Sequence, residues 1–269
     1  MLIRLANLSG PYDINAISDV CETLDCLANV YRVMGESQKA LQFYEQCLKR
    51  RVRLVSATSS DRSQVSLLLT TYEDVIELTK IQATCESKNE TLGRIGTLMV
   101  ETGSLYDHRL NKQSKALTYF QKALLIFQQM KDYKQIGNTL TLIGVIHVKR
   151  KKNQKALNCF HDSLVMRRMY STNKETVDIA ETMHNIGNCE AKEGRFEDSL
   201  RSYEEALRIR NKVHPNDQLS LAKTEHCKGL AMLQLGDMDA ALELFEKSLK
   251  VRRALLGNDH LDVSFSLHR

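Results

Sequence analysis

The chain contains few of the residues that mark domain boundaries. Its 269 residues include two prolines, Pro11 and Pro215, twelve glycines and no Ser/Gly-rich stretch. The alternation of apolar and polar residues that is typical of strands is absent, whereas apolar residues recur at spacings of three and four. No linker between domains is therefore indicated, and the pattern predicts an all-α fold.

Disulfide, metal and membrane features are also lacking. The cysteines are odd in number and contain no C-x-x-C pair: Cys21, Cys26, Cys47, Cys85, Cys159, Cys189 and Cys227. Several replace small apolar residues of a repeated pattern, which predicts reduced packing cysteines rather than a disulfide framework or a zinc site. No apolar run approaches the ~20 residues of a membrane span, and the N-terminus lacks the pattern of a signal peptide. We expect a cytoplasmic protein without a metal ion or cofactor.

The formal net charge of +5 is modest for this length. Basic residues cluster at 49–53, 149–152, 167–168 and 252–253, mostly at the ends of predicted helices. Cations are favourable at the C-terminal end of a helix dipole, so we interpret these clusters as solvated and dipole-compensating. No basic stripe with interleaved aromatic residues occurs, which argues against nucleic acid as a partner.

One pattern, small-Leu-x-x-aromatic-x-x-small-Leu, occurs five times. Its copies begin at Ala40, Ala116, Ala156, Ser199 and Ala241, which are 76, 40, 43 and 42 residues apart, and 76 is two periods of 38. A fixed period near 40 is typical of a solenoid, in which each unit buries its apolar face against its neighbours.

The fourth copy shows what each position does. Gly187 and Ala206 are small where two helices are expected to cross, Gly194 is expected to end the first helix, and Tyr203 is the large buried side chain. Small residues at positions eight, twenty and twenty-seven with an aromatic residue at twenty-four resemble the tetratricopeptide repeat. The period near 42 and the segment Met-His-Asn-Ile-Gly at 183–187 resemble the long-repeat subclass found in kinesin light chains. The resemblance implies an α-solenoid of antiparallel helix pairs in a right-handed superhelix, with no sheet.

This pattern predicts one solenoid over residues 1–269. The expected repeats are 21–54, a degenerate unit at 62–86, 89–130, 137–171, 180–213 and 222–256, with a partial repeat at each end. The partial repeats predict that the chain is a fragment of a longer protein. In the 89–130 repeat we place Gly96 at position eight and Gly103 at the end of the first helix. Residues 104–111 then become an eight-residue insertion between the two helices.

The resemblance also implies a concave groove lined by positions two, five, nine and twelve of each first helix. The candidate peptide-binding residues are Asp25, Asn29, Arg32, Thr97, Asn138, Thr141, His184, Asn188, Lys223 and His226. The same rule places Val145 and Val148 in the groove. An asparagine amide can both donate and accept, so Asn29 and Asn188 are expected to hold a peptide backbone. The alternative for both is ordinary polarity of an exposed helix.

Position five carries no lysine, so the carboxylate clamp of chaperone-binding relatives is absent. His184, His226 and His268 recur at this position, 42 residues apart. We expect them to line the groove, where their protonation near pH 6 would favour acidic peptides.

No phosphate-binding loop, zinc-protease motif or nucleophile elbow occurs in the sequence. The sequence therefore predicts a non-enzymatic scaffold or adaptor that binds peptide segments of other proteins in its groove. The alternative is a structural repeat array of a larger multidomain protein, such as a signalling NTPase, of which this chain is a fragment.

Overall fold

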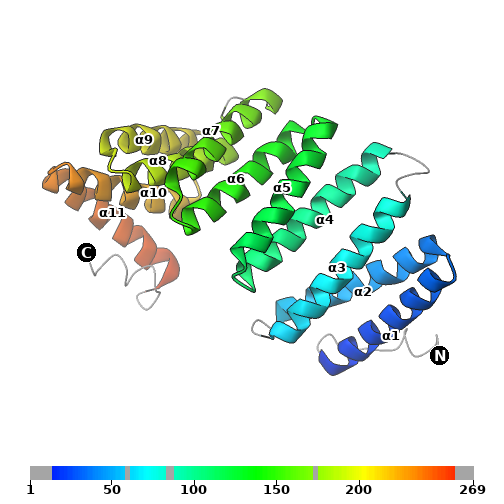
Figure 1. The fold of residues 1–269 in the computed structure, drawn as a ribbon. Coiled ribbons are helices and arrows are strands. Elements are labelled where there is room, and N and C mark those ends of the chain that lie inside the picture. The colour runs from blue at the N-terminus through cyan, green and yellow to red at the C-terminus, as the bar shows by residue number, and fades with distance from the viewer. Residues whose placement is uncertain (1–13, 58–60, 83–87, 172–174, 258–269) are drawn as a thin grey trace. The chain divides into compact units, whose positions relative to one another are not determined.

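The computed structural model describes residues 14–57, 61–82, 88–171 and 175–257. Across these ranges the chain forms α-helices and no strand, which confirms the predicted all-α fold (Figure 1). The helices are α1 (Ile14–Val33), α2 (Ser37–Ala57), α3 (Arg62–Gln82), α4 (Lys88–His108), α5 (Gln113–Met130), α6 (Tyr133–Lys149), α7 (Asn153–Tyr170), α8 (Val177–Lys192), α9 (Phe196–Val213), α10 (Gln218–Gln234) and α11 (Met238–Leu256). None of these helices combines the length and the apolar content that crossing a membrane requires.

The helices form two compact units, residues 1–131 and 132–269. In unit 1, α1 pairs with α2 and α4 pairs with α5, while α3 packs between the pairs. Unit 2 contains three consecutive pairs, α6–α7, α8–α9 and α10–α11, and each second helix packs on the first helix of the next pair. Each unit is therefore a stack of helix hairpins, as a solenoid requires.

Short turns with matching geometry close these hairpins. Gly35, Gly194 and Gly236 adopt φ angles of 77°, 76° and 89°, the left-handed region that favours glycine at a helix end. Of the helices that follow such turns, α11 begins at a capping side chain, because the Asp237 carboxylate accepts a hydrogen bond from the Ala240 N–H at 3.2 Å. Helices α5, α7 and α9 have no capping hydrogen bond from a side chain. The prediction that Gly194 ends a first helix is confirmed.

Glycine at position eight has a different role, because it lets a ring contact the backbone of the first helix. A Cβ atom added to Gly144 would lie 2.6 Å from the Phe160 ring. The same atom on Gly187 would lie 2.7 Å from the Tyr203 ring. Both rings are almost completely buried, so they have little freedom to move away.

The 89–130 repeat corrects one prediction. A Cβ atom on Gly103 would lie 2.6 Å from the Phe120 ring, so Gly103 takes position eight and does not end the helix. Helix α4 continues to His108, and the predicted eight-residue insertion at 104–111 is wrong. Gly103 precedes Ala116 by 13 residues, compared with 12 between Gly144 and Ala156. The hairpin therefore contains one extra residue, and Gly96 lies two turns earlier, against Phe127.

The segment of the predicted degenerate repeat contains a single described helix, α3. Helix α3 packs against α2, and α4 then begins the next hairpin. The partial repeats predicted at the two ends, together with Cys85 and His268, lie outside the described residues.

Candidate functional site

Buried arginines join successive helices of the stack. Each lies seven residues after the aromatic residue of its repeat, and their exposed fractions are 3 to 8 %: Arg51, Arg167, Arg210 and Arg252. Three of these residues belong to the basic clusters that we interpreted as solvated, and that interpretation is wrong for Arg51, Arg167 and Arg252. A buried guanidinium needs hydrogen-bond partners, and for Arg51, Arg167 and Arg210 the next helix supplies some of them.

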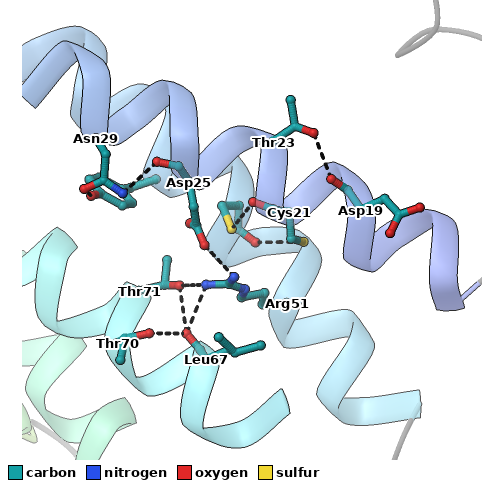
Figure 2. A network of polar contacts seen from close by, with 11 residues as sticks. Asp19, Cys21, Thr23, Asp25, Asn29, Arg51, Leu67, Thr70 and Thr71 are labelled. Atoms are coloured by element: carbon teal, nitrogen blue, oxygen red, sulfur yellow. Dashed lines mark hydrogen bonds and ion pairs between the residues drawn. The ribbon is translucent and has the colours of Figure 1, made fainter. Parts of the chain in front are cut away.

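Arg51 on α2 connects α1 to α3 (Figure 2). Its Nη2 lies 2.5 Å from the Asp25 carboxylate, and its Nη1 donates to the Leu67 carbonyl oxygen at 3.0 Å. The same Nη1 donates to the Thr71 hydroxyl. Asp25, predicted to face a ligand, is thus half-buried and ion-paired within the protein.

The two candidate asparagines are also engaged within the protein. The Asn29 Oδ1 accepts a hydrogen bond from the Tyr44 hydroxyl at 2.9 Å, and the Asn188 Oδ1 accepts one from the Tyr203 hydroxyl at 2.9 Å. Asn29 also donates through Nδ2 to the Asp25 carbonyl oxygen at 3.0 Å.

Repeats with phenylalanine in place of tyrosine lack this asparagine. The residues after their position-eight glycines are Ser104, Val145 and Leu230. Asparagine therefore occurs where a tyrosine hydroxyl needs an acceptor. This pairing accounts for Asn29 and Asn188 without a ligand, and the expectation that they hold a peptide backbone stays a prediction.

His184 is buried rather than exposed in a groove. Its exposed fraction is 1 %, its Nδ1 lies 3.2 Å from the Thr224 hydroxyl, and its ring centre lies 5.7 Å from that of Tyr203. Burial, followed by the nearby charges of Arg210 and Lys223, lowers the pKa of His184 to about 3. The expectation that this histidine protonates near pH 6 is therefore wrong.

The other predicted residues are dispersed over the two units. In unit 1, Arg32 forms an ion pair with Asp74 at 3.3 Å, and the exposed Thr97 hydroxyl donates to the Gly93 carbonyl oxygen at 3.0 Å. The corrected register of α4 moves Thr97 from position nine to position two.

In unit 2, the Thr141 hydroxyl accepts a hydrogen bond from Arg167 at 3.3 Å. Asn138 is half-buried on α6, and Lys223 is exposed on α10. His226 is half-buried, with its ring centre 5.2 Å from that of Phe245. These residues do not form one cluster with Asn188.

A hollow of about 370 Å³ opens between α6, α7 and α8 in unit 2. Its lining residues are Val145, Val148, Lys149, Phe160, Asn185, Asn188 and Lys192. Val145, Val148 and Asn188 lie at predicted groove positions. Lys149, Phe160, Asn185 and Lys192 were missed, although Asn185, Asn188 and Lys192 share the helical spacing i, i+3 and i+7.

The lining of the hollow suits binding better than chemistry. Val145, Val148 and Phe160 provide apolar surface, Asn185 provides an amide, and the exposed Lys192 provides a positive charge. A pocket with apolar walls and a few polar groups is typical of ligand binding. Within the described residues, no group of three His, Cys, Asp or Glu side chains could hold a metal ion.

Comparisons with known proteins agree with this architecture. Two family models described as tetratricopeptide repeat match the chain, one at residues 20–61 and 179–218 and the other at 220–269. The search of curated proteins found no significant match.

Several solved structures are similar to the chain. BtubC (BKLC) from P. vanneervenii is 17 % identical, with 91 % of each chain covered and a TM-score of 0.69. MamA from Desulfovibrio magneticus RS-1 is 16 % identical, with 80 % of this chain and 97 % of that chain covered and a TM-score of 0.52. Kinesin light chain repeats from Podosopora anserina are 12 % identical, with 87 % and 96 % covered and a TM-score of 0.45. The family-model matches at residues 20–61, 179–218 and 220–269, together with the repeated hairpins, show that the chain carries tetratricopeptide repeats.

Proposed function

We propose that this protein is a non-enzymatic scaffold that binds an extended peptide segment of another protein in the hollow between α6, α7 and α8. The observation that supports the proposal is the hollow itself, which opens between the first helices of two adjacent hairpins. Helix surfaces that expose such a hollow are suited to binding a partner's side chain. The alternative of a purely structural array offers no reason for an apolar hollow with polar edges.

The lining indicates how a peptide would bind. The valines and Phe160 accept one apolar side chain, whose burial contributes about 2 kcal/mol. The Asn185 amide can donate to and accept from a peptide group. The Asn188 carbonyl is occupied by Tyr203, so its Nδ2 is the remaining donor.

We also propose that the scaffold is cytoplasmic. The cysteines within the described residues are free, and Cys47 and Cys189 are completely buried, as small packing residues would be. This usage fits a compartment that keeps thiols reduced.

A peptide-array screen of the full chain tests the proposal. An Asn185→Trp substitution places an indole at the hollow, and Asn158→Trp on α7 adds the same group at an exposed position that does not line it. We expect a shared peptide motif that binds the wild type and Asn158→Trp, with binding to Asn185→Trp at least about tenfold weaker, the loss expected when an apolar side chain is no longer buried. If the screen enriches no peptide motif, the structural array is favoured. Equal binding of the peptides to all three proteins would exclude the hollow as the binding site.

A further inference from the structure

A concentrated positive charge surrounds the turn between α6 and α7. We define the basic turn as five residues: Lys149, Arg150, Lys151, Lys152 and Lys155. Residues 132–171 contain eight Lys and Arg residues but only two Asp and Glu residues. Within the described residues, the last four members of the turn, Arg150, Lys151, Lys152 and Lys155, form no ion pair with a carboxylate. The three lysines among them are exposed.

These charges lie close enough together to lower the pKa of a neighbouring histidine. The pKa of His147, one turn before Lys151, is lowered first by burial and then by the charges of Lys155, Arg150 and Lys152. The equivalent turn of the next hairpin differs, because Glu193, Glu197 and Asp198 accompany its cations there. The lack of compensating carboxylates is therefore a property of the α6–α7 turn and not of the fold.

Two of these cations also lie at backbone positions that favour other residues. Lys151 has a φ angle of 57°, whereas the residues at the same place in three other hairpins are Gly35, Gly194 and Gly236. A lysine is disfavoured in this left-handed conformation. Lys152 is the N-cap residue of α7 and makes no capping hydrogen bond through its side chain. The sequence thus retains cations at two positions where glycine and a capping residue would be more stable.

We propose that the basic turn is a docking site for an acidic segment of a partner protein. The site spans the end of one helix and the start of its neighbour, roughly 10 Å apart, which matches about three residues of an extended peptide. Carboxylates bound there would compensate the four cations that have no carboxylate partner and would face the N-terminal end of α7, where negative charge is favourable. Nucleic acid fits less well, because residues 145–157 contain no Phe, Tyr or Trp on which a base could stack.

The test measures fluorescence anisotropy with a labelled twelve-residue peptide of alternating Glu and Ser, at 50 and 200 mM salt. One variant replaces Arg150, Lys151, Lys152 and Lys155 with Gln. The control carries the same net charge through replacement of four exposed cations elsewhere with Gln: Lys49, Lys80, Lys250 and Arg253. We expect the basic-turn variant to bind at least about tenfold more weakly and the control less than about twofold more weakly, with screening by salt in all cases.

A second variant separates binding from folding. Lys151→Gly/Lys152→Ser installs the residues that the backbone prefers and removes two charges, so it should melt at a higher temperature than the wild type yet bind the peptide more weakly. The Asn185→Trp variant should bind the acidic peptide like the wild type, which distinguishes this site from the hollow.

Two results would overturn the proposal. Equal losses in the basic-turn variant and its charge-matched control would show that only net charge matters. Tighter binding of a twelve-nucleotide oligouridine than of the peptide at 200 mM salt, lost in the basic-turn variant, would assign the turn to RNA instead.

Discussion

The bond between the Tyr203 hydroxyl and the Asn188 carbonyl predicts a specific pattern of stability changes. Tyr203 is 2 % exposed, so Asn188→Val leaves a buried hydroxyl without its acceptor and should lower the free energy of unfolding by about 2 kcal/mol. Tyr203→Phe instead removes the donor. Because Asn188 is half-buried, water can replace the lost donor, and the loss should be about 0.5–1 kcal/mol.

The double variant Tyr203→Phe/Asn188→Val reproduces the pair that another repeat already has, Phe160 with Val145. It should be more stable than Asn188→Val alone, with a coupling energy of about 1–2 kcal/mol. Urea denaturation of the full chain, monitored by the helical circular dichroism signal, measures the free energy of unfolding of all four proteins. Additive losses, with no coupling, would refute the assignment of Asn188 to the tyrosine.

Three further predictions concern stability. Gly103→Ala should lower the free energy of unfolding by about 2 kcal/mol, because its Cβ would press on the Phe120 ring, and urea denaturation would show a much smaller change if Gly103 only ended a helix. Lys151→Gly should raise the free energy of unfolding by about 1 kcal/mol by relieving a left-handed lysine, and an unchanged melting temperature would contradict that strain. The lowered pKa of His184 means that the unfolded chain binds a proton that the folded chain excludes, so stability is full above pH 6.5 and falls as the pH decreases toward 3. His184→Gln should flatten that slope in urea titrations at pH 4, 5 and 7, and an equal slope in both proteins would contradict the burial.

Much of the fold could be predicted because the contacts that define a hairpin are visible in the sequence. The glycine of Gly144 and the ring of Phe160 are separated by a fixed number of residues, and the same pair recurs in other repeats. The prediction failed at α4 because two glycines, Gly96 and Gly103, both contact rings of α5. They lie seven residues apart on one helix face, so the pattern allowed two registers and we chose the wrong one.

The site was less predictable, because burial by a neighbouring repeat is not visible in one repeat. The groove positions implied by the resemblance to the tetratricopeptide repeat include Val145 and Val148, which line the hollow. It also selected His184, which Thr224 of the next hairpin helps to bury, and Asp25, which the buried Arg51 holds in an ion pair. Polar and charged side chains are usually at least partly exposed, so the burial of His184 and of Arg51 could not be expected from residue type.

The central claim is that the hollow between α6, α7 and α8 binds peptides. Isothermal titration calorimetry of one array-selected peptide against the full chain tests it most directly, with Asn185→Trp and Asn158→Trp as the matched pair. We predict an affinity about tenfold lower for Asn185→Trp and unchanged for Asn158→Trp. Equal affinities for the three proteins would contradict the claim.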